Sequence, residues 1–128
     1  MPDFRRVALD GRIVDTAGLR GRVLVIKFFA DYCQPCRRSL PEVEQLHRSH
    51  GEIAFLGVSE DESEAAAAGV RSRFGLSFPI VHDRGQGISG RFRVTALPMT
   101  FVIDKRGIVR WVADEREQDL RSAIAAVR

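Results

Sequence analysis

Residues 23–36 read VLVIKFFADYCQPC, and this stretch decides the fold. Its first seven residues are apolar and often β-branched apart from one lysine, a pattern typical of a strand that is buried on both faces. Two cysteines, Cys33 and Cys36, follow the strand with two residues between them. We therefore predict a buried strand that delivers a pair of thiols to the start of the next element.

That next element is predicted to be a helix from Pro35 to about His50. Its apolar positions recur every three or four residues, with charged residues on the other sides, which indicates an amphipathic helix with one face in the core. Cys36 lies on that apolar face. Pro35 suits the first helical turn, where its missing N–H would have no partner in any case, and its rigidity should hold the two sulfurs close.

The remainder of the chain alternates between strand-like and helix-like segments. We expect an N-terminal hairpin around the turn dipeptide Asp10-Gly11 and a second hairpin within residues 99–112. We also expect a buried strand at 53–58, helices at 62–74 and 117–127, an edge segment at 78–81 and a glycine-flanked piece at 85–92. Alternating strands and helices predict a three-layer α/β fold with a central mixed sheet.

Length and charge fit a single domain over residues 1–128. The net charge of +3 comes from 20 basic and 17 acidic residues that are interleaved along the chain, which argues against nucleic acid or a membrane surface as a partner. We expect a monomer. The sequence starts without the long apolar run of a signal peptide, so we expect a cytoplasmic protein if Met1 is the native start.

The chain has two cysteines in all, which excludes a framework of disulfide staples. At the start of a helix, Cys33 should face unpaired N–H groups and the positive end of the helix dipole, which favour thiolate over thiol. Cysteines in such motifs titrate at roughly 3.5 to 7.5 instead of ~8.5. We expect Cys33 to attack a disulfide and Cys36 to resolve the mixed disulfide, chemistry that needs no metal and no organic cofactor.

A half zinc site is the alternative interpretation of two cysteines this close, and His47 and His50 would complete it. The spacing from the second cysteine to the histidines misses that of zinc fingers. A helix over residues 35–50 would also separate Cys36 from His47 by about 16 Å at ~1.5 Å of rise per residue, too far to share a metal. We expect both histidines at the far end of the helix, in structural or solvent-exposed roles.

Two segments resemble the active site of thioredoxins. Residues 27–37, KFFADYCQPCR, resemble the segment with the redox cysteines, and Pro41 matches the proline inside the same helix of that family. Residues 95–101, TALPMTF, resemble the segment with the cis-proline of the thioredoxin fold. The resemblance implies that Pro98 is cis and packs against the two cysteines, and that Leu97 offers backbone groups to an extended substrate.

Further segments narrow the resemblance to the TlpA/ResA-like thiol-disulfide oxidoreductases. Residues 9–12 and 19–23 resemble the N-terminal extension of that branch, residues 60–88 its central insertion and residues 101–107 its closing hairpin. The resemblance implies a thioredoxin fold, and dithiol-disulfide exchange with protein substrates and an upstream redox partner. It also implies an extracytoplasmic bacterial protein, and we expect the protein to act as a reductase.

Three residues depart from the family pattern. Tyr32 replaces the usual tryptophan, and Ser39 stands where the TlpA/ResA branch often has glutamate, which leaves the proton acceptor for Cys36 open. Lys27 stands where many thioredoxins have a buried aspartate. Its ammonium could stay buried and stabilise a thiolate at either cysteine, in which case desolvation lowers its pKa. It could instead reach water beyond an apolar stem, and this common habit of lysine is the interpretation that we favour.

Rival functions are a noncatalytic interaction module, a peroxidase and a copper-delivering protein. Peroxiredoxins have threonine or serine three residues before their reactive cysteine, where this chain has Ala30. Copper-delivering relatives use a wider cysteine spacing, although His82 could match their distal histidine. We assign Asp31 and residues 60–64 to solvated surface and a helix start. Five phenylalanines are assigned to the core: Phe28, Phe29, Phe55, Phe74 and Phe101.

Overall fold

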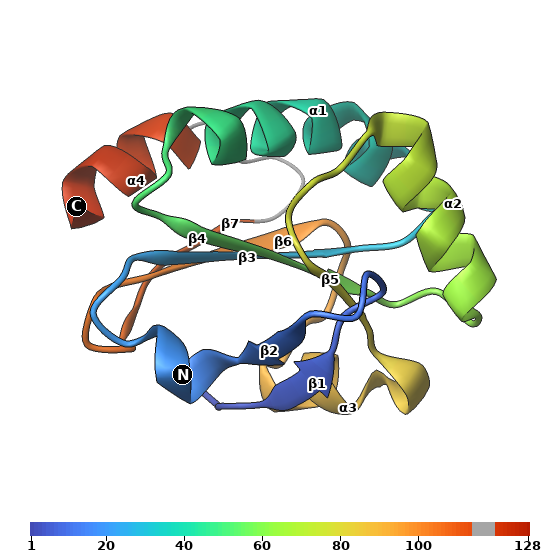
Figure 1. Cartoon of the computed structure of the whole chain (residues 1–128), viewed down its shortest axis with the longest axis horizontal. Coiled ribbons are helices and arrows are strands. Elements are labelled where there is room, and N and C mark those ends of the chain that lie inside the picture. The colour runs from blue at the N-terminus through green and yellow to red at the C-terminus, as the bar shows by residue number, and fades with distance from the viewer. Residues whose placement is uncertain (114–119) are drawn as a thin grey trace.

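The computed structural model describes residues 1–113 and 120–128. Its strands are β1 (Arg5–Val7), β2 (Ile13–Asp15), β3 (Leu24–Phe29), β4 (Ala54–Ser59), β5 (Ile80–His82), β6 (Met99–Ile103) and β7 (Val109–Ala113). Its helices are α1 (Gln34–Ser49), α2 (Glu64–Phe74), α3 (Gly87–Arg91) and α4 (Leu120–Val127), with short 3-10 turns at Thr16–Leu19 and Arg84–Gln86. Figure 1 shows the sheet between two covering layers.

The central sheet is mixed, as predicted. Its strand order is β5-β4-β3-β6-β7, and β1 pairs with β2 in a separate hairpin. β3 pairs in parallel with β4 on one side and antiparallel with β6 on the other. β5 adds a parallel edge strand beside β4, and β7 adds an antiparallel one beside β6. All six residues of β3 are buried, so the prediction of a strand covered on both faces is confirmed.

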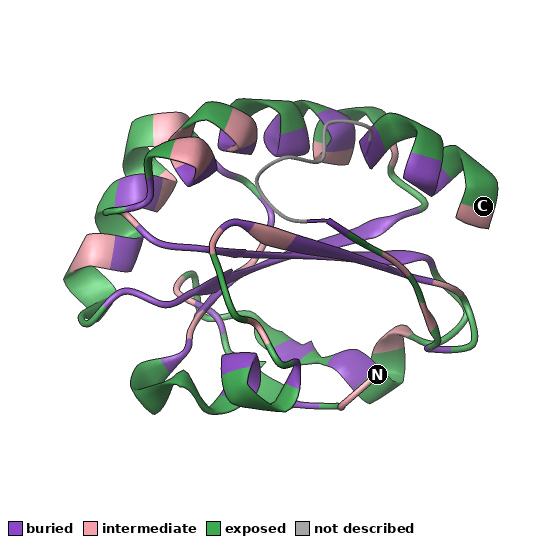
Figure 2. Ribbon diagram, turned by 180° about the vertical axis from the view of Figure 1, so that it is seen from behind, coloured by how far each residue is buried: buried purple, intermediate pink, exposed green. Residues whose placement is uncertain are grey.

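The two faces of the sheet are covered by different elements. α1, α2 and α4 lie over one face, and β1, β2 and α3 lie over the other (Figure 1). Figure 2 shows the buried residues concentrated in the strands and on the inner sides of the helices. The cluster beneath α1 includes Phe29, Phe55 and both cysteines, and the opposite cluster includes Phe28 and Phe101. These phenylalanines are buried as predicted, whereas Phe74 is only partly buried.

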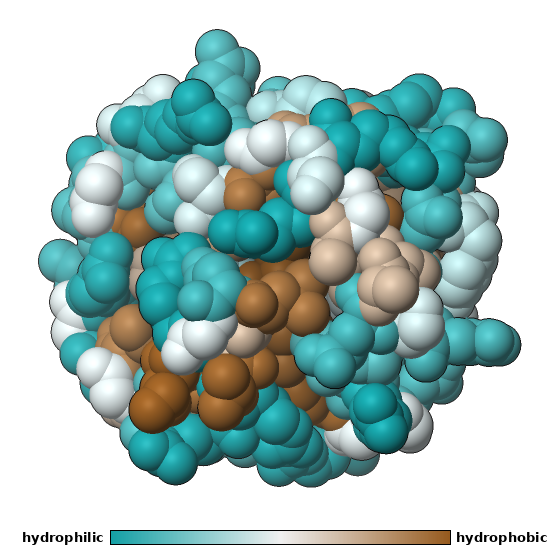
Figure 3. Space-filling view, turned by 45° about the vertical axis from the view of Figure 1, so that its right-hand side comes forward, coloured by the Kyte–Doolittle hydropathy of each residue, from teal (hydrophilic) through white to brown (hydrophobic). Residues whose placement is uncertain are grey.

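The N-terminal hairpin has one face toward the sheet and one toward water. Val14 of β2 is 5% exposed, whereas Ile13 beside it and Val7 of β1 are 60% and 67% exposed. This alternation is what a half-covered strand requires, because successive side chains point to opposite faces. Figure 3 shows apolar side chains gathered on one side of the surface and surrounded by hydrophilic ones.

The remaining elements are found with small shifts of their ends. The second helix begins at Glu64 instead of residue 62, because the Ser63 side chain caps it by accepting the Ala66 N–H at 3.1 Å. Residues 60–88, which resemble the central insertion, contain α2 and β5. The last helix is described from Leu120, and its predicted start at residue 117 lies outside the described residues.

Two acidic residues that were assigned to the solvated surface are buried. Glu60 and Asp61 directly follow β4 and are 6% and 5% exposed. The Asp61 carboxylate accepts the Asp31 N–H and the Ser59 hydroxyl, each at 2.8 Å. Neither carboxyl oxygen of Glu60 has a hydrogen-bond partner within the described part of the chain. The surface assignment is wrong for these two residues because neighbouring loops cover the end of β4.

Gly57, in the middle of β4, leaves no room for a side chain. A Cβ there would lie 3.0 Å from the rings of Phe29 and Phe78 and 3.2 Å from Ile80. We expect Gly57→Ala to lower the free energy of unfolding by about 1–3 kcal/mol, the usual effect of overpacking a core. Gly69→Ala, in α2 with open space around the new Cβ, is the control and should raise it by roughly 0.5–1 kcal/mol. Denaturant unfolding measures both, and a Gly57→Ala protein as stable as wild type would contradict this packing.

The buried carboxyl of Glu60 makes stability fall as pH rises. Burial above all, helped by the Asp83 carboxyl, raises the pKa of Glu60 from 4.5 to about 8. The folded protein therefore keeps a proton that the unfolded chain releases, and the cost grows from about pH 5 to about pH 8. We expect Glu60→Gln to gain about 2 kcal/mol over wild type across that range, allowing for partial access of water, at ~1.4 kcal/mol per pKa unit. Unfolding curves at both ends of the range test this, and a difference that does not change with pH would contradict it.

Candidate active site

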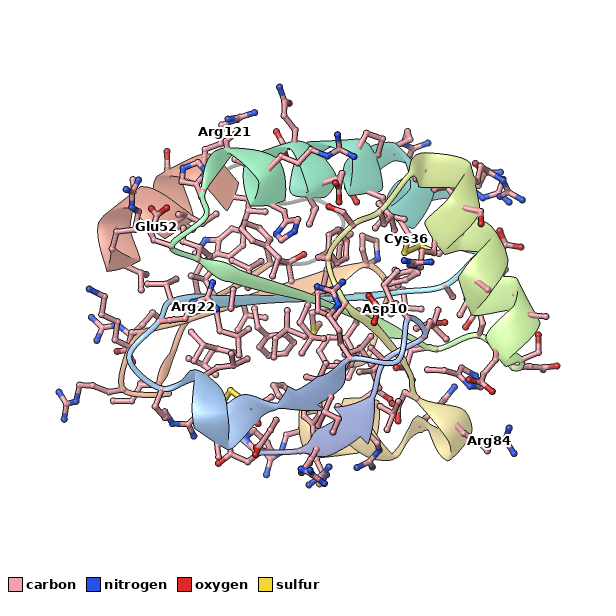
Figure 4. The ribbon with its side chains drawn as sticks, viewed as in Figure 1. Asp10, Arg22, Cys36, Glu52, Arg84 and Arg121 are labelled. Carbon is pink, nitrogen blue, oxygen red and sulfur yellow. A yellow bond between two sulfur atoms is a disulfide. The ribbon has the colours of Figure 1, made fainter. Side chains whose placement is uncertain are left out.

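The two cysteines lie where the chain passes from β3 into α1. β3 ends at Phe29 and α1 begins at Gln34, with Cys33 as its N-cap residue. Cys33 and Cys36 are joined in a disulfide, and their Cα atoms are 5.3 Å apart. Figure 4 shows Cys36 near the start of α1, on the side that faces the sheet. The predicted placement of the pair at the start of a helix is confirmed.

Cys33 caps the helix with its own sulfur. The Cys36 N–H donates to Sγ of Cys33 at 3.2 Å, and the Arg37 N–H donates to the Cys33 carbonyl at 3.3 Å. The first N–H groups of a helix have no partner inside it, and that end carries a partial positive charge. Pro35, which has no N–H, lies in the first turn. The arrangement therefore stabilises negative charge on Sγ of Cys33.

The two sulfurs differ in accessibility. Cys33 is 8% exposed, whereas Cys36 is 0% exposed and packs in the core beneath α1. Tyr32, beside Cys33, is 69% exposed, so an aromatic ring borders the accessible sulfur. A disulfide in another protein can therefore approach Cys33 and not Cys36.

Lys27 is buried in the central strand. Side chains two residues apart in a strand share a face, and Val25 and Phe29 pack in the cluster that contains both cysteines. Lys27 is 3% exposed, so its ammonium does not extend into water and the interpretation favoured from the sequence is wrong. The reason is that the covering helices leave no path from this face to solvent. Burial lowers the pKa of Lys27 to about 8, and the Glu42 carboxylate opposes that effect.

The Leu97–Pro98 peptide bond is cis, as the family resemblance implies. Pro98 is buried and directly precedes β6, whose first residue, Met99, pairs with Phe28 near the end of β3. Antiparallel pairing therefore brings Pro98 to the end of the sheet that carries Cys33. Leu97 packs against the cluster that contains both cysteines.

Asp31 fixes the loop that precedes Cys33. Its carboxylate accepts hydrogen bonds from Arg37 at 2.9 Å and Arg73 at 3.0 Å, and the Arg37 bond above all holds the pKa of Asp31 below its usual range. The Asp31 N–H donates to Asp61. Asp31 is therefore paired and half-exposed instead of simply solvated. The role of Asp61 was not predicted from the sequence, although an acidic residue directly behind a buried strand is a signal that could have indicated it.

Ser39 does not provide the carboxylate that could accept a proton from Cys36, as the glutamate at this position could in the TlpA/ResA branch. Its hydroxyl donates to the Cys36 carbonyl at 3.1 Å, which is a contact within the helix. Pro41 lies inside α1, as the resemblance implies. The position at which relatives often have an acid therefore holds a hydroxyl that the backbone already engages.

The histidines of α1 lie far from the cysteines, as expected. The His47 ring packs edge-on against Phe55 and Phe78, with centroid distances of 5.5 and 5.8 Å, and burial lowers the pKa of His47. His50 ends the helix, and its N–H donates to the Leu46 carbonyl at 3.0 Å. Their roles are therefore structural.

His82 also has a structural partner. Its Nε2 atom donates to the Asp61 carbonyl at 2.7 Å, which fixes the tautomer because a carbonyl oxygen only accepts. Within residues 1–113 and 120–128, no group of three or more histidine, cysteine, aspartate and glutamate side chains is arranged to hold a metal ion. Among the helices in those two ranges, none has both the length and the apolarity to cross a membrane.

Comparisons with known proteins agree with this geometry. The sequence profile of the AhpC/TSA family matches residues 1–112. The thiol-disulfide oxidoreductase ResA of Geobacillus thermodenitrificans (strain NG80-2) is 30% identical over 131 residues, which cover 99% of this chain and 75% of that protein. ResA of Bacillus thuringiensis (strain Al Hakam) is 29% identical over 121 residues, which cover 92% of this chain and 70% of that protein.

A solved structure extends the agreement from sequence to fold. The structure of MTB dsbF in its mixed oxidized and reduced forms superposes with a TM-score of 0.90 and 26% identity, over 98% of this chain and 95% of that one. The relatives are named thiol-disulfide oxidoreductases, and the disulfide between Cys33 and Cys36 fits that activity. The chain therefore belongs to the AhpC/TSA family and is a thioredoxin-fold thiol-disulfide oxidoreductase.

Proposed function

We propose that this protein reduces disulfides in protein substrates. The observation that carries the proposal is the capped, accessible sulfur of Cys33 in front of the buried sulfur of Cys36. In the reduced protein, the Cys33 thiolate attacks one substrate sulfur, and the other substrate sulfur leaves as a thiolate. Cys36 then attacks Cys33, so that the Cys33–Cys36 disulfide forms and the second substrate sulfur is released.

The exchange balances without a metal or an organic cofactor. Two electrons pass from the pair of cysteines to the substrate disulfide. Because Cys33 attacks as a thiolate, the substrate sulfurs take up one proton from the Cys36 thiol and one from water. A second dithiol protein upstream returns Cys33 and Cys36 to the reduced state. In this proposal the protein is a monomer. Family resemblance supports a location outside the cytoplasm of a bacterium.

In this proposal, the substrate binds across the rim of the active site, beside Cys33. Its chain runs in extended form between the exposed ring of Tyr32 and the cis bond at Pro98, with the backbone of Leu97 as its hydrogen-bond partner. The support is geometric, because antiparallel pairing of β6 with β3 brings the Leu97–Pro98 bond to the end of the sheet that carries Cys33.

Lys27 is the further group that we assign to the mechanism. It lies on the same face of the sheet as the two cysteines and out of contact with bulk water. A cation in such a setting favours a nearby thiolate more strongly than it would at the surface, because the effective dielectric constant is lower. Lys27 thus stabilises the thiolate of the reduced protein at pH values below its own pKa of about 8.

Serine variants of the two cysteines test the order of attack. Cys33→Ser should abolish dithiothreitol-driven insulin reduction, because a hydroxyl does not replace a thiolate as nucleophile. Cys36→Ser should accumulate a mixed disulfide between Cys33 and the substrate, which mass spectrometry of unreduced samples detects. Equal insulin reduction by wild type and Cys33→Ser would defeat the enzyme mechanism and favour a noncatalytic interaction module.

Lys27→Met tests the buried cation. Methionine keeps much of the stem and removes the charge, so we expect the thiolate pKa of the reduced protein to rise by about one unit, the lower end of the effect of a nearby opposite charge. The ultraviolet absorbance of the thiolate, followed with pH, measures it. Lys105→Met, at an exposed position, is the matched control and should change nothing. An unchanged thiolate pKa in Lys27→Met would remove Lys27 from the mechanism.

A further inference from the structure

The loop between β3 and α1 must hold Cys33 in place in two chemical states. In the disulfide form, the bond to Cys36 keeps Sγ of Cys33 at the start of α1. In the reduced form that bond is absent, and the Cys33 thiolate keeps the stabilising N–H groups of the helix only if the loop stays in place. Contacts that hold the loop without the disulfide therefore control the reactivity of the reduced protein.

Asp31 is the residue through which this loop is held. Its N–H donates to the Asp61 carboxylate at 2.8 Å, and its carbonyl accepts Nε–H of Arg37 at 3.0 Å. Its carboxylate accepts hydrogen bonds from Arg37 at 2.9 Å and from Arg73 at 3.0 Å. The backbone N–H, the carbonyl and the carboxylate of Asp31 are all engaged, so its backbone and its side chain are both fixed.

The partners of Asp31 come from three different elements. Arg37 lies in the first turn of α1, Arg73 lies in the last turn of α2, and Asp61 follows β4. Figure 1 shows α2 beside the start of α1, which lets Arg73 reach the loop. Asp61 is itself held, because its other carboxyl oxygen accepts the Ser59 hydroxyl at 2.8 Å. The loop is therefore tied to the sheet, to α1 and to α2.

The position of Asp31 is passed directly to Cys33. The Cys33 N–H donates to the Ala30 carbonyl at 3.2 Å, which closes residues 30–33 into a tight turn. Arg37 contacts both sides of this turn, because its side chain binds Asp31 and its backbone N–H donates to the Cys33 carbonyl at 3.3 Å. A shift of Asp31 would therefore move Cys33 relative to the start of the helix.

The contacts of Asp31 are stronger than an ordinary surface ion pair. Single exposed pairs contribute little to stability, and networks of charges are the exception. Here two arginines share one carboxylate, and the Asp61 carboxylate that accepts the Asp31 N–H belongs to a residue that is only 5% exposed. Hydrogen bonds to ionised groups are shorter and stronger than those between neutral ones. Because Arg37 and Arg73 hold the pKa of Asp31 below its usual range, its carboxylate stays ionised while a thiol titrates.

We propose that Asp31 is a positioning residue for Cys33, and that Arg73 of α2 acts on the dithiol through it. The proposal rests on the proposed function, because it concerns the reduced form that attacks a substrate. It predicts an effect opposite to that of charge alone. A carboxylate near a thiol disfavours the thiolate, so its removal would by charge alone lower the thiol pKa. Loss of the positioning contacts instead raises that pKa, because the thiolate moves away from the helix N-terminus.

Asp31→Ala tests the sign of the effect. We expect the thiolate pKa of the reduced protein to rise by about half a unit, the size of a charge–dipole interaction at a helix N-terminus. The ultraviolet absorbance of the thiolate, followed with pH, measures it. If Asp31→Ala does not fold, Asp31→Ser takes its place, because the serine side chain is also too short to bind both arginines. Thermal unfolding checks each variant.

Glu62→Ala is the matched control for charge. Glu62 and Asp31 line the same depression, which extends to Tyr32 beside Cys33. Glu62 is exposed and forms no hydrogen bond or ion pair within residues 1–113 and 120–128. Its replacement removes the same negative charge without releasing the loop, so the thiolate pKa should not rise.

Arg73→Gln separates an effect through Asp31 from a direct effect of the arginine charge. In the wild-type background we expect it to raise the thiolate pKa by roughly 0.3 unit, the size of an exposed ion pair. In the Asp31→Ala background it should change nothing further, because the carboxylate that it held is gone. A direct effect of the charge would persist in both backgrounds.

The outcomes separate this proposal from the proposed function. A thiolate pKa that falls or stays unchanged in Asp31→Ala would overturn the positioning role, and so would an equal rise in Glu62→Ala. An Arg73→Gln effect of the same size in both backgrounds would overturn the action of Arg73 through Asp31. None of these measurements uses a substrate. Failure of the wild-type protein to reduce insulin would therefore defeat the proposed function and leave the positioning of Cys33 to be decided by the pKa values.

Discussion

Backbone pairing along both edges of β3 is the interaction on which the active site depends. Parallel pairing with β4 places the residues that follow both strands at one end of the sheet, where the Asp31 N–H meets the Asp61 carboxylate at 2.8 Å. Antiparallel pairing with β6 brings the Leu97–Pro98 bond to that same end. Three segments that are distant in the sequence therefore surround Cys33, and none of them needs a long or mobile loop to reach it.

The same constraint decides what surrounds the sulfurs. Because both faces of β3 are covered, a charged residue within it cannot reach water, and Lys27 stays in the interior at 3% exposure. Because the chain leaves β3 at its carboxyl end and turns directly into α1, Cys33 becomes the N-cap residue and Cys36 lies one turn further in. The difference in exposure between the two sulfurs is thus a consequence of the strand-to-helix connection.

Local sequence patterns were sufficient for the parts of the fold that depend on burial alone. The apolar run at 23–29 predicted β3, and the three- and four-residue spacing after Pro35 predicted α1. The cis bond at Pro98 required the family resemblance, because no periodicity marks a cis peptide. The burial of Lys27 and Glu60 was missed for a different reason. Charged residues are rarely fully buried, and only the arrangement of the covering layers shows where that rule fails.

The start of α1 also affects the redox balance of the dithiol. Its partial positive charge favours thiolate at Cys33, which stabilises the reduced form and makes the couple more oxidising. The role that we propose for Lys27 would act in the same direction, because a buried cation near the sulfurs also favours thiolate.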